Sequence, residues 1–105
     1  MKMISWNVNG IRAVAKKGLD EIIANLDADI ICFQETKATV EQVKETLEFA
    51  KGYTVYANEA ERKGYSGTAI LSRVPVLNVS YDMNIEEHDQ EGRVICVELE
   101  NCYVL

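Results

Sequence analysis

The first third of the chain holds two strand-like segments separated by an amphipathic helix, and this order limits the fold more than any other feature. Residues 2–8 are compact and rich in strand-forming types, and residues 27–33 contain four apolar residues in a row. Residues 11–16 predict a short turn of helix. A longer helix face follows at Leu19, Ile22, Ile23 and Leu26. Strands joined by a crossover of this length run parallel, so we expect an α/β fold with the helix packed on one face of the sheet.

The remainder of the chain predicts one more helix and then antiparallel strands. Thr39 and Gln42 fit a capping box, and Gly52 is expected to end the helix. The apolar face of this helix comprises Val40, Val43, Leu47 and Ala50. A period of two then predicts half-buried antiparallel strands at residues 53–58, 67–72, 76–81 and 93–99. In the third of these, the apolar side comprises Leu77, Val79 and Tyr81.

The composition is that of one ordinary globular domain spanning residues 1–105. Of its residues, 48% are apolar and 27% charged, and no apolar run approaches the roughly 20 residues that cross a bilayer. The N-terminus lacks the long apolar stretch of a secretory signal, so we expect a cytoplasmic protein with no membrane partner. Cys32, Cys96 and Cys102 lie in strand-like stretches without a CxxC spacing, which predicts reduced core thiols.

The net charge of −6 argues against a polyanionic partner, because nucleic-acid-binding domains more often carry a basic excess. A DNA substrate would therefore depend on local cations and a bound metal rather than on the overall field.

Polar side chains follow both of the predicted parallel strands. Asn7 and Asn9 end the first, and Glu35 follows the second. Ligands of open α/β sheets bind beyond the carboxyl ends of parallel strands, and carboxylate and carboxamide oxygens suit Mg²⁺. Spacing alone favours a plainer alternative, in which Glu35 is a solvated loop residue and Asn9 a turn former.

Two later loops combine charged residues with glycine. Arg62, Lys63 and Tyr65 precede a strand and could face a nucleic-acid backbone, although a hairpin with a charged tip is the favoured alternative. His88 lies among carboxylates without a nucleophile or metal-ligand spacing, which favours a solvated loop histidine. Arg93 could pair with Glu91 as easily as bind phosphate.

Four segments, taken in order, carry a resemblance to a known family. They are SWNVNGIRA at residues 5–13, DIICFQETK at 29–37, GYSGTAILSR at 64–73 and HDQEGRVI at 88–95. They resemble the exonuclease III type of abasic-site endonuclease in the endonuclease/exonuclease/phosphatase superfamily. This resemblance implies half of a four-layered α/β sandwich, with helices on one face of a mixed β-sheet.

The resemblance also implies a chemistry. Members hydrolyse double-stranded DNA 5′ to abasic sites and degrade DNA from 3′ to 5′, with Mg²⁺ as cofactor and Mn²⁺ as an alternative. Glu35 would be the metal ligand, Asn7 would belong to the catalytic network around metal and phosphate, and Asn9 would lie near the metal. Three residues would contact DNA: Tyr65, with Lys37 and Arg73 in supporting positions.

Later motifs of the family, including its catalytic histidine, would fall beyond Leu105, and His88 does not match that histidine. We therefore expect an N-terminal portion that is inactive alone. The alternative is a non-catalytic fragment that binds DNA or self-associates through an uncovered sheet face.

Overall fold

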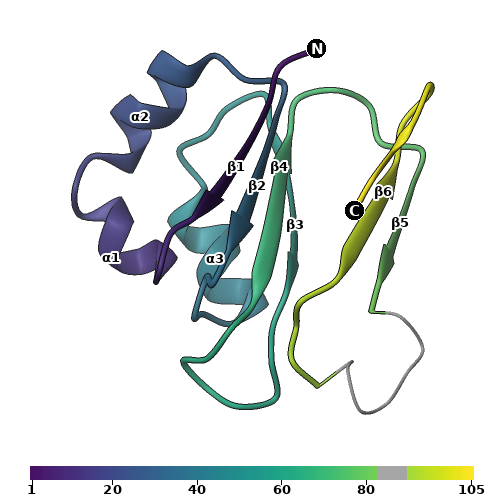
Figure 1. Cartoon of the computed structure of the whole chain (residues 1–105). Helices are drawn as coiled ribbons and strands as arrows, with labels where there is room; N and C mark the ends of the chain where they lie inside the picture. Colours follow the sequence, from purple (N-terminus) through teal and green to yellow (C-terminus); the bar gives the residue numbers. More distant parts are fainter. Residues whose placement is uncertain (83–89) are drawn as a thin grey trace.

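The computed structural model describes residues 1–82 and 90–105, and it opens with the predicted strand, helix, strand order (Figure 1). Strand β1 spans Met3–Asn7 and β2 spans Ile30–Gln34, with α1 at Ile11–Ala15 and α2 at Leu19–Leu26 between them. The two strands pair in parallel, from Met3 opposite Ile30 to Asn7 opposite Gln34. The parallel crossover predicted from the apolar pattern is therefore confirmed.

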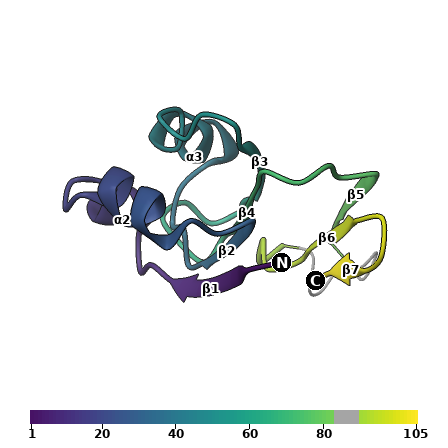
Figure 2. The ribbon, with the colours of Figure 1, turned by 90° about the horizontal axis from the view of Figure 1, so that it is seen from above.

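These strands belong to a four-stranded mixed sheet in the order β1-β2-β4-β3. Strand β3 spans Thr54–Asn58 and β4 spans Thr68–Ser72, and β4 runs antiparallel to both of its neighbours. Helix α3 spans Val40–Thr46. All three helices lie on one face of this sheet (Figure 2). The predicted α/β class, with helices on one face of a mixed sheet, is confirmed.

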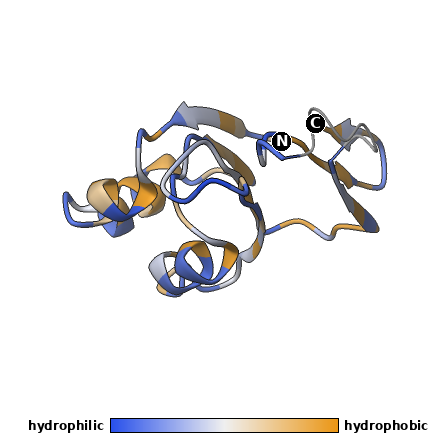
Figure 3. Ribbon diagram, turned by 90° about the horizontal axis from the view of Figure 1, so that it is seen from below, coloured by the Kyte–Doolittle hydropathy of each residue, from blue (hydrophilic) through white to orange (hydrophobic). Residues whose placement is uncertain are grey.

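The core between helices and sheet comes from alternate strand residues. Ile31, Phe33 and Leu71 project toward the helices and are almost fully buried. The helices contribute Ile11, Leu19, Ile23, Val43 and Leu47 to the same cluster. Helices α2 and α3 carry both hydrophilic and hydrophobic residues, as amphipathic helices at a sheet surface do (Figure 3).

Helix α3 begins with the predicted capping box. Gln42 N donates to Thr39 Oγ1 at 3.1 Å, and Thr39 N donates to Gln42 Oε1 at 2.9 Å. The expected continuation to Gly52 is wrong, because helix geometry ends at Thr46. Tighter three-residue hydrogen bonds, such as Ala50 N to Leu47 O at 3.0 Å, replace the helical pattern there.

The second strand also begins later than expected, at Ile30 rather than at Asp27. Asp27 caps the end of α2 in the left-handed conformation, with φ 46°, and is therefore not extended. The chain straightens only after this turn.

A second, three-stranded antiparallel sheet follows, in the order β5-β6-β7. Its strands are Asn78–Tyr81, Ile95–Glu98 and Tyr103–Val104. Ile95, Val97, Leu99 and Val104 pack against Ile30 and Ile70, which lie on the face of the first sheet that the helices leave free. The second sheet therefore covers part of that face, beside β3 and β4.

The expected burial is confirmed for the strand predicted at residues 93–99 and wrong for most of the apolar side of the strand predicted at 76–81. Ile95, Val97 and Leu99 are buried, whereas Leu77 is 63% and Tyr81 is 43% exposed. Strand β5 pairs only with β6 among the described strands, so its apolar side chains have fewer neighbours than an inner strand provides.

Two expectations from composition can be compared with the described residues. Cys32, Cys96 and Cys102 are free and half-buried, and burial raises the pKa of the Cys32 thiol. No described helix is long and apolar enough to cross a membrane. His88 lies outside the described residues, and the cytoplasmic location stays a prediction.

Candidate metal and DNA-binding site

The parallel pairing of β1 and β2 continues past both strands and brings the predicted site residues together. Val8 N donates to Gln34 O at 3.0 Å, and Gly10 N donates to Glu35 O at 2.8 Å. These bonds hold the turn after β1 against the turn after β2. The carboxyl ends of the two strands therefore form one polar edge.

Asn7, Asn9 and Glu35 are in contact at this edge. Asn7 Nδ2 donates to Glu35 Oε2, and Asn9 N donates to Asn7 Oδ1 at 3.0 Å. Both asparagines are exposed, and the Glu35 side chain is 40% exposed. The spatial grouping predicted from strand ends is thus observed, with oxygen atoms that a hard cation can reach.

Lys37 also reaches this group. Its Nζ donates to Asn9 Oδ1 at 2.5 Å and lies 4.0 Å from Glu35 Oε1. The Lys37 ammonium therefore stands beside the only carboxylate of the group.

The backbone around these side chains is strained. Asn9, Glu35, Lys37 and Ser66 all have positive φ, between 48° and 54°. Residues with a side chain seldom adopt this left-handed conformation, and those that do are concentrated at functional sites. Lys37 N donates to Ser66 O at 2.8 Å, which ties the turn after β2 to the loop before β4.

Gly67 allows that loop to approach. A Cβ atom at Gly67 would lie 2.4 Å from the Oγ1 of Thr36, whose side chain is fully buried, and its φ is +85°. Thr36 N donates to Gly67 O at 3.1 Å. Glycine is therefore required here by both space and backbone angle.

Tyr65 lies in the same loop, between two arginines. Its hydroxyl donates to Glu91 Oε1 at 3.0 Å and accepts from Arg93 Nη2 at 3.1 Å. The guanidinium groups of Arg62 and Arg93 lie 5.2 and 5.7 Å from the ring centre. The hydrogen bond to Tyr65 raises the pKa of Arg93, and the charges of Glu91 and Glu35 add to this.

Arg93 Nη2 also lies 3.7 Å from Glu91 Oε1. Pairing with Glu91 was one of the two roles that the sequence offered for Arg93, the other being phosphate binding. These contacts fix the orientation of the half-buried Tyr65 ring.

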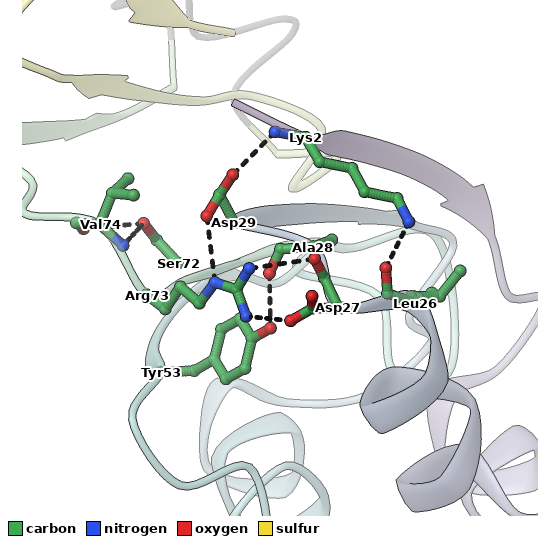
Figure 4. Close-up of polar contacts among 9 residues, drawn as sticks. All are labelled: Lys2, Leu26, Asp27, Ala28, Asp29, Tyr53, Ser72, Arg73 and Val74. Atoms are coloured by element: carbon green, nitrogen blue, oxygen red, sulfur yellow. Dashed lines mark hydrogen bonds and ion pairs between the residues drawn. The ribbon is translucent and has the colours of Figure 1, made fainter.

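Arg73 lies at the opposite end of the sheet, where β2 begins (Figure 4). Its Nη1 contacts Asp27 Oδ1 at 2.7 Å, and its Nε contacts Asp29 Oδ1 at 3.1 Å. Its guanidinium carbon is 5.9 Å from the centre of the Tyr53 ring. These bonds raise the pKa of Arg73, chiefly through Asp27. Arg73 therefore does not lie with the other candidate residues, and its guanidinium is engaged in an ion-pair network with Asp27 and Asp29.

Comparison with known proteins decides the family. A model of the Endonuclease/Exonuclease/phosphatase family matches residues 4–104. The chain belongs to the Endonuclease/Exonuclease/phosphatase family. The resemblance drawn from the four sequence segments is confirmed.

Individual proteins are similar to this chain over all or nearly all of its length. An exodeoxyribonuclease of Bacillus subtilis (strain 168) is 53% identical across all of this chain, which spans 41% of that relative. A DNA-(apurinic or apyrimidinic site) endonuclease of Dictyostelium discoideum is 37% identical, and the chain spans 29% of it. A solved 3′ phosphatase from Neisseria, bound to a product DNA hairpin, has a TM-score of 0.80 and 26% identity over 98% of this chain and 39% of its own.

Arg12 also lies near the site, and the sequence pattern did not single it out. Its Nη2 donates to Lys37 O at 3.0 Å, which links α1 to the turn after β2. Arg12, Arg62, Lys63 and Tyr65 line one pocket of about 270 Å³. The signal was present in the segment GIRA, where a cation lies two residues after the Asn9–Gly10 turn.

The side-chain oxygens of Asn7, Asn9 and Glu35 are suited to a hard divalent cation. Glu35 offers a carboxylate, and Asn7 and Asn9 offer carboxamide oxygens, the ligand types that Mg²⁺ takes while keeping several waters. The described residues contain no cluster of three or more histidines, cysteines and acids that could hold a metal. Asn7, Asn9 and Glu35 by themselves therefore fit one side of a magnesium site, with Glu35 as its charged ligand.

Proposed function

We propose that this chain is the N-terminal portion of a Mg²⁺-dependent DNA-repair nuclease that hydrolyses phosphodiesters 5′ to abasic sites and degrades DNA from 3′ to 5′. The observation that carries the proposal is the contact between Asn7 and Glu35 at the shared carboxyl edge of β1 and β2. It occurs in a chain that is 53% identical, along the whole of its own length, to part of an exodeoxyribonuclease.

In this proposal the site residues divide the work of binding and orientation. When bound, Mg²⁺ supplies positive charge that stabilises the developing charge on a phosphodiester; Mn²⁺ is the alternative ion. Glu35 holds the ion. The Asn7 amide orients the Glu35 carboxylate and can donate to a phosphate oxygen, and Asn9 adds an amide oxygen.

The DNA contacts would come from the same edge. Tyr65 is held between Arg62 and Arg93 and presents a fixed planar ring to the groove of a duplex with an abasic site. Arg12, which lines a pocket with Tyr65, and Lys37, which contacts Asn9, add positive charge, so a local field can overcome the net charge of −6. Arg73 has no part in this surface.

The proposal includes inactivity of these 105 residues alone. The chain spans 41% or less of the curated relatives described above, and the site residues provide a single carboxylate. Groups that act together in catalysis lose most of the rate when some are missing. We therefore propose that cleavage requires the region that the relatives carry in addition.

One observation favours a second candidate, a non-catalytic module that associates with itself. Tyr103 is 69% and Leu105 is 87% exposed, and Leu77 and Tyr81 are exposed as well. Exposed apolar surface of this kind promotes association. Gel filtration at high concentration separates the candidates, because a monomer would contradict self-association.

The decisive experiment is a chimera in which this chain replaces the matching segment of the Bacillus subtilis exodeoxyribonuclease. We expect Mg²⁺-dependent cleavage of a duplex with one abasic site by the chimera and none by the chain alone. EDTA and Glu35→Ala should each abolish cleavage. Arg73→Met is the matched control and should retain activity.

Two results would contradict the proposal. A folded chimera without cleavage would show that this chain does not provide the N-terminal half-site. Cleavage by the chain alone, sensitive to Glu35→Ala, would show that no further region is needed.

A further inference from the structure

The side chain of Lys37 lies where a cation ligated by Glu35 and Asn9 would compete for the same oxygens. Its Nζ is 2.5 Å from Asn9 Oδ1 and 4.0 Å from Glu35 Oε1. A 2.5 Å contact leaves no room for another cation on the same line to that oxygen. Lys37 therefore occupies part of the coordination space that the proposed metal needs.

The position of Lys37 is set by the backbone rather than by chance orientation of a long side chain. Glu35 and Lys37 both have left-handed φ, of 54° and 52°, with the buried Thr36 between them. Lys37 N donates to Ser66 O at 2.8 Å, and Lys37 O accepts from Arg12 Nη2 at 3.0 Å. With both backbone groups held, the side chain starts from a fixed point beside the site.

The charge balance of the group makes this placement consequential. Asn7 and Asn9 are neutral, so Glu35 is the only negative charge in contact with Lys37 among the four side chains. One carboxylate and one ammonium leave the group without net charge. An arriving divalent ion thus meets a neutral group that already contains a cation.

We propose that Lys37 is a built-in counter-ion that competes with the divalent ion for Glu35 and Asn9 and is displaced when the ion binds. This inference rests on the proposed function, since it takes Glu35 as the metal ligand. Lys37 is then a positioning residue that lowers metal affinity, in addition to the DNA contact expected from sequence.

The test is direct binding of Mn²⁺, as a spectroscopic probe ion, to the full chain and its variants by electron paramagnetic resonance. Lys37→Met removes the charge and should tighten binding by about five- to tenfold, the scale of an exposed ion pair with one charged hydrogen bond. Lys51→Met is the matched control, because Lys51 lies near Asp27 and Arg73 at the other end of the sheet. It should bind Mn²⁺ like the parent chain.

A second measurement needs no substitution. Amine acylation followed by mass spectrometry should modify Lys37 faster once Mg²⁺ is added, because the displaced ammonium loses its contact with Asn9. Lys51 provides the internal reference and should react at the same rate with and without Mg²⁺. An unchanged or slower rate at Lys37 would overturn the displacement.

The outcomes separate this inference from the proposed function. Binding that is lost in Glu35→Ala but no tighter in Lys37→Met overturns the counter-ion and leaves the metal site intact. Binding that survives Glu35→Ala overturns both. Binding that is tighter in Lys37→Met and lost in Glu35→Ala supports both.

Discussion

The two ends of the first sheet pair acids with bases in different ways. At the start of β2, Arg73 contacts Asp27 and Asp29 at 2.7 and 3.1 Å. At the end of β2, Lys37 lies 4.0 Å from Glu35, whose other oxygen accepts from an asparagine. A guanidinium forms several directed bonds at once, whereas an ammonium is a mobile point charge. Saturated pairing stabilises one end, and loose pairing leaves the other available for a ligand.

The largest effect is expected at Gly67, which lets the loop before β4 approach the site end. Gly67→Ala should lower the free energy of unfolding by about 2–4 kcal/mol, because it adds both a clash with Thr36 and backbone strain at positive φ. Urea unfolding measures this. Gly64→Ala is the control, since a Cβ there has nothing within 4 Å, and should cost about 1 kcal/mol.

Glu35→Gln tests whether the loosely paired end binds metal. We expect at least a roughly tenfold loss of Mn²⁺ affinity, because the only charged ligand is removed from the group. The thermal midpoint should stay nearly unchanged, since Glu35 is partly exposed and weakly paired. A large drop in the midpoint with unchanged metal binding would reverse the assignment of the two ends.

Arg73→Met and Lys37→Met sharpen the comparison as a pair. Arg73→Met should lower the melting temperature by roughly a few degrees through loss of its bonds to Asp27 and Asp29. It should leave the KM of the chimera for abasic DNA unchanged. Lys37→Met should leave the melting temperature nearly unchanged and change the KM. Weaker DNA binding in Arg73→Met would contradict the structural role of Arg73.

The smallest effect is the pH dependence at Asp29. The backbone N–H of Lys2, followed by Arg73, lowers the pKa of Asp29 below its ordinary value. Its stabilising contribution is therefore complete above about pH 3.9 and is lost as the pH falls toward the lowered value. Acid unfolding of Asp29→Asn should be flatter in that range. An acid profile identical to that of the parent chain would show that the contacts of Asp29 with Lys2 and Arg73 contribute less to stability than their distances indicate.

The site end was predictable because its signals are local. The apolar run before Glu35 and the asparagines after the first strand placed three polar side chains at one edge. The capping box at Thr39 was similarly local. Each of these patterns follows from neighbouring residues and the rules for parallel strands.

The rest depends on contacts between distant residues. Arg73 meets Asp27 from 46 positions away, and nothing near Arg73 in the sequence indicates that partner. The left-handed backbone of Lys37 is hydrogen-bonded to Ser66, which belongs to another loop. The exposure of Leu77 likewise reflects which strands pair, and an alternating pattern does not contain that information.

The left-handed residues at the site end have a consequence for attempts to engineer the protein. Asn9, Glu35, Lys37 and Ser66 account for four of the six non-glycine residues with positive φ in the described chain. Glycine at any of them would relieve backbone strain, so a screen for heat resistance would favour these replacements. Each replacement would remove a side chain from the site end. Selection for robustness alone would thus act mainly on the proposed half-site, where four of these six residues lie, and less on the Arg73 end, which contains one of them, Asp27.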